Sequence, residues 1–138
     1  MTMMEDGDIL KKLQTAVIAA VAASNTPLLP IKVIGRTFVP PSTQKWLEIV
    51  WIPNNPTGDF WGDEKNYQGM IRLILHWQND DAGAYPPLAV IASIAGYFGK
   101  DMFIPGVKIS ENPNLTGALE NGTETLYPVG FRYQSFRP

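Results

Sequence analysis

The sequence predicts an α+β domain with a mainly antiparallel sheet of four to five strands and two helices packed on one face. Two segments have the apolar spacing of amphipathic helices, and four or five have the alternation or β-branched composition of strands. The strands are separated more often by loops than by helices, which disfavours a parallel sheet. The 138 residues contain no internal repeat or linker, so we expect a single domain over residues 1–138.

The first predicted element is a helix that begins at Asp8, a suitable N-cap, and ends in the polar segment before Pro27. Acidic residues precede Lys11 and Lys12, where a secretory leader would carry positive charge, so an amphipathic helix is the better interpretation. Its apolar residues recur at helical spacing: Ile9, Leu13, Val17, Ala20 and Val21.

Strands are expected in the middle of the chain. A short one is predicted within residues 28–34, and a longer one over 46–52, where both faces are apolar apart from Glu48, as in the interior of a sheet. A polar, glycine-containing loop is expected over 57–66, and the clearest strand follows over Tyr67–Trp77. Its two faces carry alternating residues: Ile71, Leu73, Leu75 and Trp77 on one, and Met70, Arg72, Ile74 and His76 on the other.

The second helix is predicted to open at Pro86-Pro87, because proline is favoured in a first helical turn. It is expected to end near Gly99, with an apolar stripe of Leu88, Ile91, Ala92, Ala95 and Phe98. A short strand over 107–110 and a loop over 112–122 come next. The final strand, 126–136, has an apolar face of Tyr127, Val129, Phe131 and Tyr133.

Composition excludes several classes of function. Eleven basic and thirteen acidic residues give a net charge of −2, which argues against nucleic acid as the main partner. Because the chain has no cysteine, thiolate metal sites and thiol nucleophiles are excluded, and a single histidine excludes a histidine metal cage. No apolar run approaches the roughly 18–20 residues that would span a bilayer.

The candidate chemical groups do not form a complete site. His76 has no serine motif to activate, so an edge or surface histidine is the better interpretation. The acidic groups Asp59, Asp63 and Glu64, and Asp80 and Asp81, lack the spacing of a calcium loop and are predicted to be solvated. Glycine-rich phosphate loops are absent. We therefore predict no catalytic, cofactor-binding or metal-binding residues.

Two aromatic residues remain, Phe60 and Trp61, both within the polar loop. An exposed aromatic residue with small and polar neighbours is a common anchor of protein interfaces. The alternative is that both side chains fold back over the edge of the sheet. Sequence leaves both interpretations open, because it does not show which way a loop side chain points.

The order of the segments resembles the tail terminator (tail completion) proteins of long-tailed bacteriophages and prophages, from about Ile9 to Tyr133. After the alanine-rich helix, the resemblance rests on short patterns at Trp46–Trp51, Pro53-Asn54, Gly69–Leu75, Tyr97–Lys100, Val107–Ile109, Asn112-Pro113 and Tyr127–Val129. The family has no short functional motif that could be transferred residue by residue.

The resemblance implies a structural protein without enzymatic activity or cofactor. It implies a homo-oligomeric ring, expected to be a hexamer, that caps the tail-tube protein, ends tube growth and joins the head-tail connector protein. The expected location is the virion tail, after assembly in the host cytoplasm, with no membrane contact and with DNA passing through the ring without specific binding. The residues themselves suggest where contacts lie: the segment 54–68 with Asp59, Phe60, Trp61, Asp63 and Glu64, and the candidate interface charges Arg72 and Arg132.

Two alternatives remain. The nearer is another neck or tail-tube component of the same virion, such as a head-closure or tube subunit. The other is a small hydrolase or metal-dependent enzyme built around His76 with Asp80 or Asp81.

Overall fold

The computed structural model describes residues 6–24, 26–53, 57–58, 65–99, 103–104 and 107–136. The described part contains the helices α1 (Asp6–Ala23) and α2 (Tyr85–Ala95). Its strands are β1 (Ile31–Lys32), β2 (Trp46–Pro53), β3 (Thr57–Gly58), β4 (Lys65–Gln78), β5 (Phe103–Ile104), β6 (Val107–Ile109), β7 (Asn114–Leu115), β8 (Leu119–Asn121) and β9 (Glu124–Phe136).

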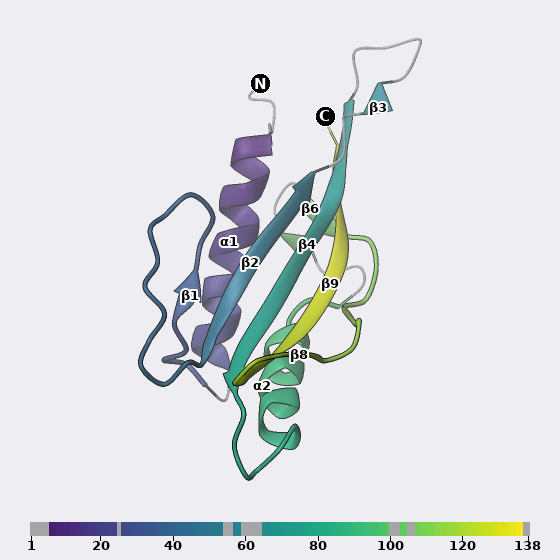
Figure 1. Ribbon diagram of the computed structural model, residues 1–138. Coiled ribbons are helices and arrows are strands. Elements are labelled where there is room, and N and C mark those ends of the chain that lie inside the picture. Colours follow the sequence, from purple (N-terminus) through teal and green to yellow (C-terminus); the bar gives the residue numbers. More distant parts are fainter. Residues whose placement is uncertain are drawn as a thin grey trace.

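The strands form one mixed sheet in the order β1-β2-β4-β9-β6-β5, with β3 beside β4, and β7 and β8 beside β9. Only β1 and β2 pair in parallel among the strands of the described residues. Both helices lie behind the sheet in Figure 1, so the α+β class and the placement of the helices on one face are confirmed. The opposite face of the sheet is not covered by either helix; we call it the open face.

The expected number of four to five strands is wrong, because the described residues contain nine. Four of the nine are only two residues long, which is too short for any alternation to show in the sequence. Each forms by pairing with a neighbouring strand: β3 with β4, β7 with β9, β1 with β2 and β5 with β6. The loop expected over 112–122 therefore contains β7 and β8, both paired with β9.

The α1 helix buries the predicted stripe: Ile9, Leu13, Val17, Ala20 and Val21 are all at most 4% exposed. The predicted N-cap is wrong, since the helix already includes Asp6 and Asp8 lies in its first turn. A carboxylate in the first turn still faces the partial positive charge of the helix start, which is why acidic residues are common there.

The α2 helix contains both prolines in its first turn, as predicted, but ends at Ala95 rather than near Gly99. Its buried face is also rotated from the predicted stripe: Ala92 is exposed, and the buried residues are Pro87, Val90, Ile91 and Ile94. Phe98, beyond the helix, is fully buried and its ring stacks on Phe131 with centroids 4.8 Å apart. This contact places the end of α2 against β9.

The two long strands supply the centre of the core. The strand β4 pairs with β2 on one side and with β9 on the other, over the whole length of β9. The apolar alternation predicted for both strands is confirmed: Ile71, Leu73, Leu75, Tyr127, Val129, Phe131 and Tyr133 are all buried beneath the helices. The other side chains of these strands therefore point to the open face.

The strands β3 and β4 form a hairpin that extends past the end of β2 (Figure 1), while β9 continues beside β4 as far as Asn66. Thr57 pairs with Asn66, and Gly58 pairs with Lys65. The polar loop expected over 57–66 is therefore partly strand, because the edge of the long strand β4 provides a partner. What remains between the paired residues is the segment 59–64, which lies outside the described residues.

Candidate functional site

The predicted contact residues divide into two groups. Asp59, Phe60, Trp61, Asp63 and Glu64 lie outside the described residues, so only the strands that flank them are described. Arg72 and Arg132 lie on the open face, on the neighbouring strands β4 and β9. The structure thus brings the two arginines onto one surface, which the alternation of both strands also predicts.

Arg72 is half-buried at the centre of the open face. Its guanidinium Nη2 lies 4.0 Å from the Met70 sulfur, and its Nε is buried without a hydrogen-bond partner. Gly130 stands opposite Arg72 in β9, and a Cβ there would lie 3.5 Å from the Met70 sulfur, an ordinary contact distance. Among the described residues, no carboxylate forms an ion pair with Arg72. A half-buried cation that pairs with no carboxylate of the described residues is suited to an acidic or carbonyl group on another molecule.

Arg132 stands opposite Met70 and is more exposed, with 54% of its side chain accessible. Its Nε lies 3.6 Å from Oε1 of Glu111 in an exposed ion pair. Such pairs contribute about 0–1 kcal/mol to stability, so this pair can open at little cost when a partner approaches. Arg132 lines a polar hollow of about 230 Å³ together with Gln68, Glu111 and Gln134.

His76 is the residue whose position differs most from the prediction. It is buried, at 8% exposure, on the central strand β4, so the expectation of an edge or surface histidine is wrong. The ring stacks on Trp46 with centroids 3.7 Å apart and an interplanar angle of 6°. The position near the end of a strand suggested an edge, but pairing with β2 and β9 continues to that end.

Both ring nitrogens of His76 face carboxylates. Nε2 lies 2.9 Å from Oε1 of Glu48 on β2, and Nδ1 lies 3.3 Å from Oε1 of Glu124 on β9. Both contacts are hydrogen bonds only when each ring nitrogen carries a proton, because a carboxylate only accepts. Lys32 on β1 adds a contact of 3.6 Å to Glu48. We call Lys32, Glu48, His76 and Glu124 the His76 cluster. Its side chains join β1, β2, β4 and β9 on the open face, near the C-terminal end of β4.

The sequence analysis missed the two glutamates as partners of His76. A signal for Glu48 was present, since it is the one charged residue in an otherwise apolar strand and alternation places it on one face with Trp46. No signal in the sequence pointed to Glu124, because the register between β4 and β9 sets that contact. Both ring nitrogens therefore face carboxylates of the neighbouring strands.

No group of three or more His, Asp or Glu residues in the described part of the chain is arranged to hold a metal ion. Asp80, one of the two aspartates proposed beside His76, instead accepts a hydrogen bond of 2.9 Å from the backbone N–H of Ala82, as in an Asx turn. Neither of the described helices is long and apolar enough to cross a membrane.

Comparison with known proteins yields a similarity of fold. No family model matches the chain, and no curated protein matches it. One solved structure, of a protein whose name states no function, superimposes with a TM-score of 0.78 and covers 96% of both chains at 20% sequence identity. At that identity the likeness concerns the fold alone: the whole α+β arrangement recurs in another protein.

Proposed function

We propose that the chain is a structural protein of a bacteriophage tail, a tail terminator that assembles head-to-tail into a closed ring of six copies. The ring caps the tail-tube protein, ends its polymerisation and presents a surface to the head-tail connector protein. In this proposal the protein resides in the virion tail, needs no cofactor and performs no catalysis. DNA passes through the ring without specific binding.

The observation that carries the proposal is the presence of two unlike, unpartnered surfaces on one subunit. One is the open face, with the half-buried Arg72. The other is the hairpin of β3 and β4, which extends past the end of β2 at one end of the sheet (Figure 1). A ring that caps a tube needs unlike surfaces on each subunit, because one must reach the neighbouring copy and another must face the tube or the connector. The order of the segments resembles that of tail terminators, and this resemblance is the reason for proposing a ring at the end of a tail tube.

The surroundings of His76 support a structural role over the hydrolase alternative. Its two nitrogens are held by Glu48 and Glu124, and its ring is covered by Trp46. A general base needs a nitrogen within reach of a nucleophile, and both are already committed. The cluster instead links neighbouring strands through their side chains, and such links would keep the sheet of a ring subunit rigid.

The purified full chain tests the proposal by native mass spectrometry combined with electron microscopy. We expect single rings with the mass of six copies at high protein concentration. Stacked filaments would reject the terminator and favour the tube-subunit alternative, because tube subunits polymerise without limit. A monomer at every concentration, or turnover of a substrate that is lost in His76→Ala, would reject a ring-forming structural protein.

A further inference from the structure

A groove runs between α1 and the turn that follows β1. The turn, Val33–Arg36, is closed by a 3.5 Å contact from the Arg36 N–H to the Val33 carbonyl, and Gly35 adopts a positive φ of 82° that favours glycine. The backbone N–H of Ile34 donates to Oε1 of Gln14 over 3.0 Å, which fixes the turn to the helix. Two adjoining cavities of about 340 and 330 Å³ share Ile18, Val33 and Arg36, so they form one groove, the α1–turn groove.

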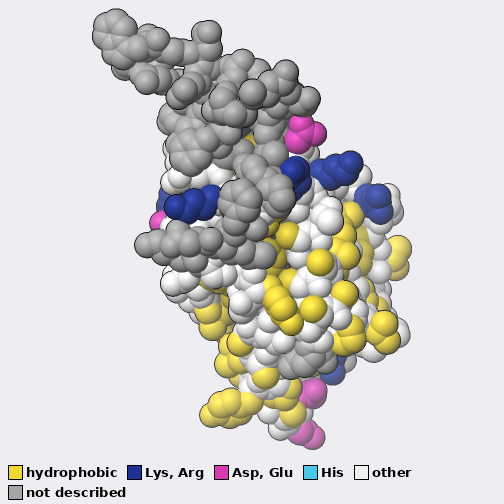
Figure 2. All heavy atoms as spheres, turned by 180° about the vertical axis from the view of Figure 1, so that it is seen from behind, with side chains coloured by type: hydrophobic (Ala, Val, Ile, Leu, Met, Phe, Trp, Pro, Cys, Tyr) yellow, Lys and Arg dark blue, Asp and Glu magenta, His cyan; other side chains and the backbone are white. Residues whose placement is uncertain are grey.

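The floor of the α1–turn groove is apolar and partly open to solvent. Ile18 is 47% exposed and Ile34 is 37% exposed. The remaining apolar lining comes from α1, from β1 and from the segments on both sides of β1: Leu10, Leu29, Ile31, Val33 and Phe38. Figure 2 shows apolar side chains spread over the helix-bearing side of the molecule. An exposed apolar surface of this kind is typical of an interaction site.

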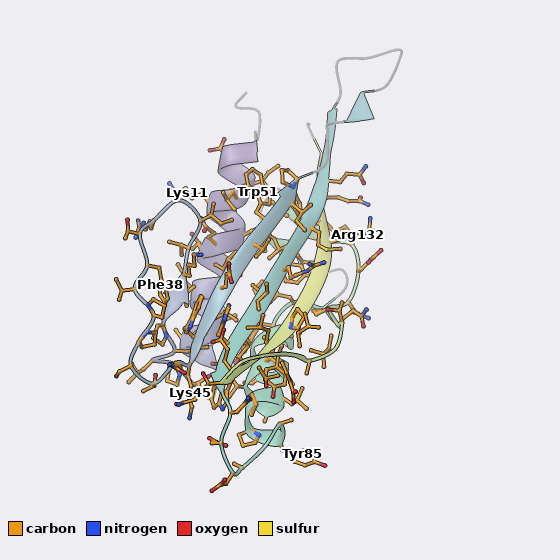
Figure 3. All side chains as sticks on the ribbon, viewed as in Figure 1. Lys11, Phe38, Lys45, Trp51, Tyr85 and Arg132 are labelled. Carbon is orange, nitrogen blue, oxygen red and sulfur yellow. The ribbon has the colours of Figure 1, made fainter. Side chains whose placement is uncertain are left out.

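Two cations, Lys11 and Arg36, also line the groove. In the part of the chain that the structure describes, neither forms an ion pair with a carboxylate. Lys and Arg side chains gather at one edge of the apolar surface in Figure 2, and Figure 3 shows Lys11 and Phe38 on the same side of the molecule. The groove therefore suits an occupant that carries apolar side chains next to carboxylates.

The chain itself contains such a segment. Residues 59–64 read Asp-Phe-Trp-Gly-Asp-Glu, two aromatic residues among three acidic ones. The segment joins β3 to β4, and this hairpin extends past the end of β2 (Figure 1). Aromatic side chains in an apolar pocket, bordered by paired charges, are the usual anchors of an interface.

We propose that residues 59–64 of one copy occupy the α1–turn groove of the neighbouring copy, with Phe60 and Trp61 on the apolar floor and the acidic residues facing Lys11 and Arg36. The contact joins two different patches, so each copy uses its segment toward one neighbour and its groove toward the other. The inference rests on the proposed function, because it names the contact that holds the ring together.

Photo-crosslinking of the full chain tests this contact directly. A photoreactive phenylalanine derivative replaces Trp61, and copies labelled with ¹⁴N and ¹⁵N are mixed, so that crosslinks between copies carry both isotopes. We expect crosslinks between copies that map to residues 7–18 or 33–38. Crosslinks that map elsewhere in the neighbour, that stay within one copy, or that do not form at all would overturn the proposal.

Complementation gives a second test that does not depend on the photoreactive group. Ile18→Asp removes a working groove, and the pair Phe60→Ala with Trp61→Ala removes a working segment. For each variant alone we expect mostly monomer, with the fraction of the chain found in rings at least about tenfold lower than for the wild type. Mixed, they should give a dimer and nothing larger, since one intact segment meets one intact groove.

The matched controls are Leu119→Asp and Tyr85→Ala, both at exposed apolar residues away from the groove, and both should form rings. If the wild-type chain forms rings and so do Ile18→Asp and the Phe60→Ala, Trp61→Ala double variant, the proposed contact is wrong while the proposed function stands. If the wild-type chain forms no ring, the proposed function fails with it.

Discussion

Gly69 on β4 is crowded by two neighbouring strands. A Cβ at this position would lie 2.6 Å from the Tyr133 hydroxyl and 2.7 Å from the Ile52 carbonyl oxygen. The Tyr133 side chain passes this position to reach Trp51, whose Nε1–H donates to the Tyr133 hydroxyl over 2.9 Å. Glycine is therefore required here by space, since its backbone lies in a regular strand and its φ is not positive.

Gly69→Ala is expected to destabilise the protein by about 1–3 kcal/mol, the usual cost of adding a methyl group to a packed site. The matched control is Gly130→Ala on β9, where the nearest atom, the Met70 sulfur, would lie at an ordinary 3.5 Å. Urea unfolding measures both changes as shifts of the midpoint. Equal midpoints for the two variants would contradict the steric explanation.

At the scale of elements, the cluster around His76 joins β2, β4 and β9 through side chains as well as through the backbone. His76→Ala removes the stacking on Trp46 and leaves Glu48 and Glu124 without their shared partner. We expect unfolding to become easier by about 2 kcal/mol, less than for a fully buried ion pair because both glutamates keep some contact with water.

Lys32→Ala is the control within the same cluster. Its side chain is 43% exposed and its Nζ lies 3.6 Å from Oε2 of Glu48, so its loss should cost less than about 1 kcal/mol. Urea midpoints again compare the two variants. A larger effect for Lys32→Ala would show that the histidine does not hold the cluster. The His76→Ala variant should still assemble into rings, whereas an enzyme that depended on His76 would lose its activity.

The sequence predicted the long elements well, and the reason is periodicity. Residues such as Leu73 and Val129 repeat every second position over whole strands, so their burial follows from alternation alone. The failures share a different cause. The short strands, the burial of His76 and its contact with Glu124 depend on which strands become neighbours, and no local pattern encodes that choice. The groove was missed for the same reason, since Gln14 and Ile34 meet only through the fold.

At the scale of the whole molecule, the segment 59–64 is expected to be needed for assembly and dispensable for folding. Replacing it by Asn-Gly, a pair favoured in two-residue hairpin turns, keeps the pairing of Gly58 with Lys65. The variant should retain the circular dichroism spectrum and urea midpoint of the wild type. Native mass spectrometry should then find a monomer where the wild type forms rings.

A shortened variant that still forms rings of normal mass would remove this segment from the assembly contacts. Asp80→Ala and Asp81→Ala, in an exposed turn at the other end of β4, serve as controls for loss of acidic charge and should assemble normally.

The pairing of β4 with β9 also sets the order in which the protein can form during synthesis. The centre of the sheet joins a strand that ends at Gln78 to one that begins at Glu124, with α2 and four short strands between them. Ribosomes add about 5–20 residues per second, so β2 and β4 wait several seconds for their last neighbour. Throughout that interval one edge of β4 has no partner and α2 lacks the strand against which it packs, so we expect the nascent chain to need protection from aggregation.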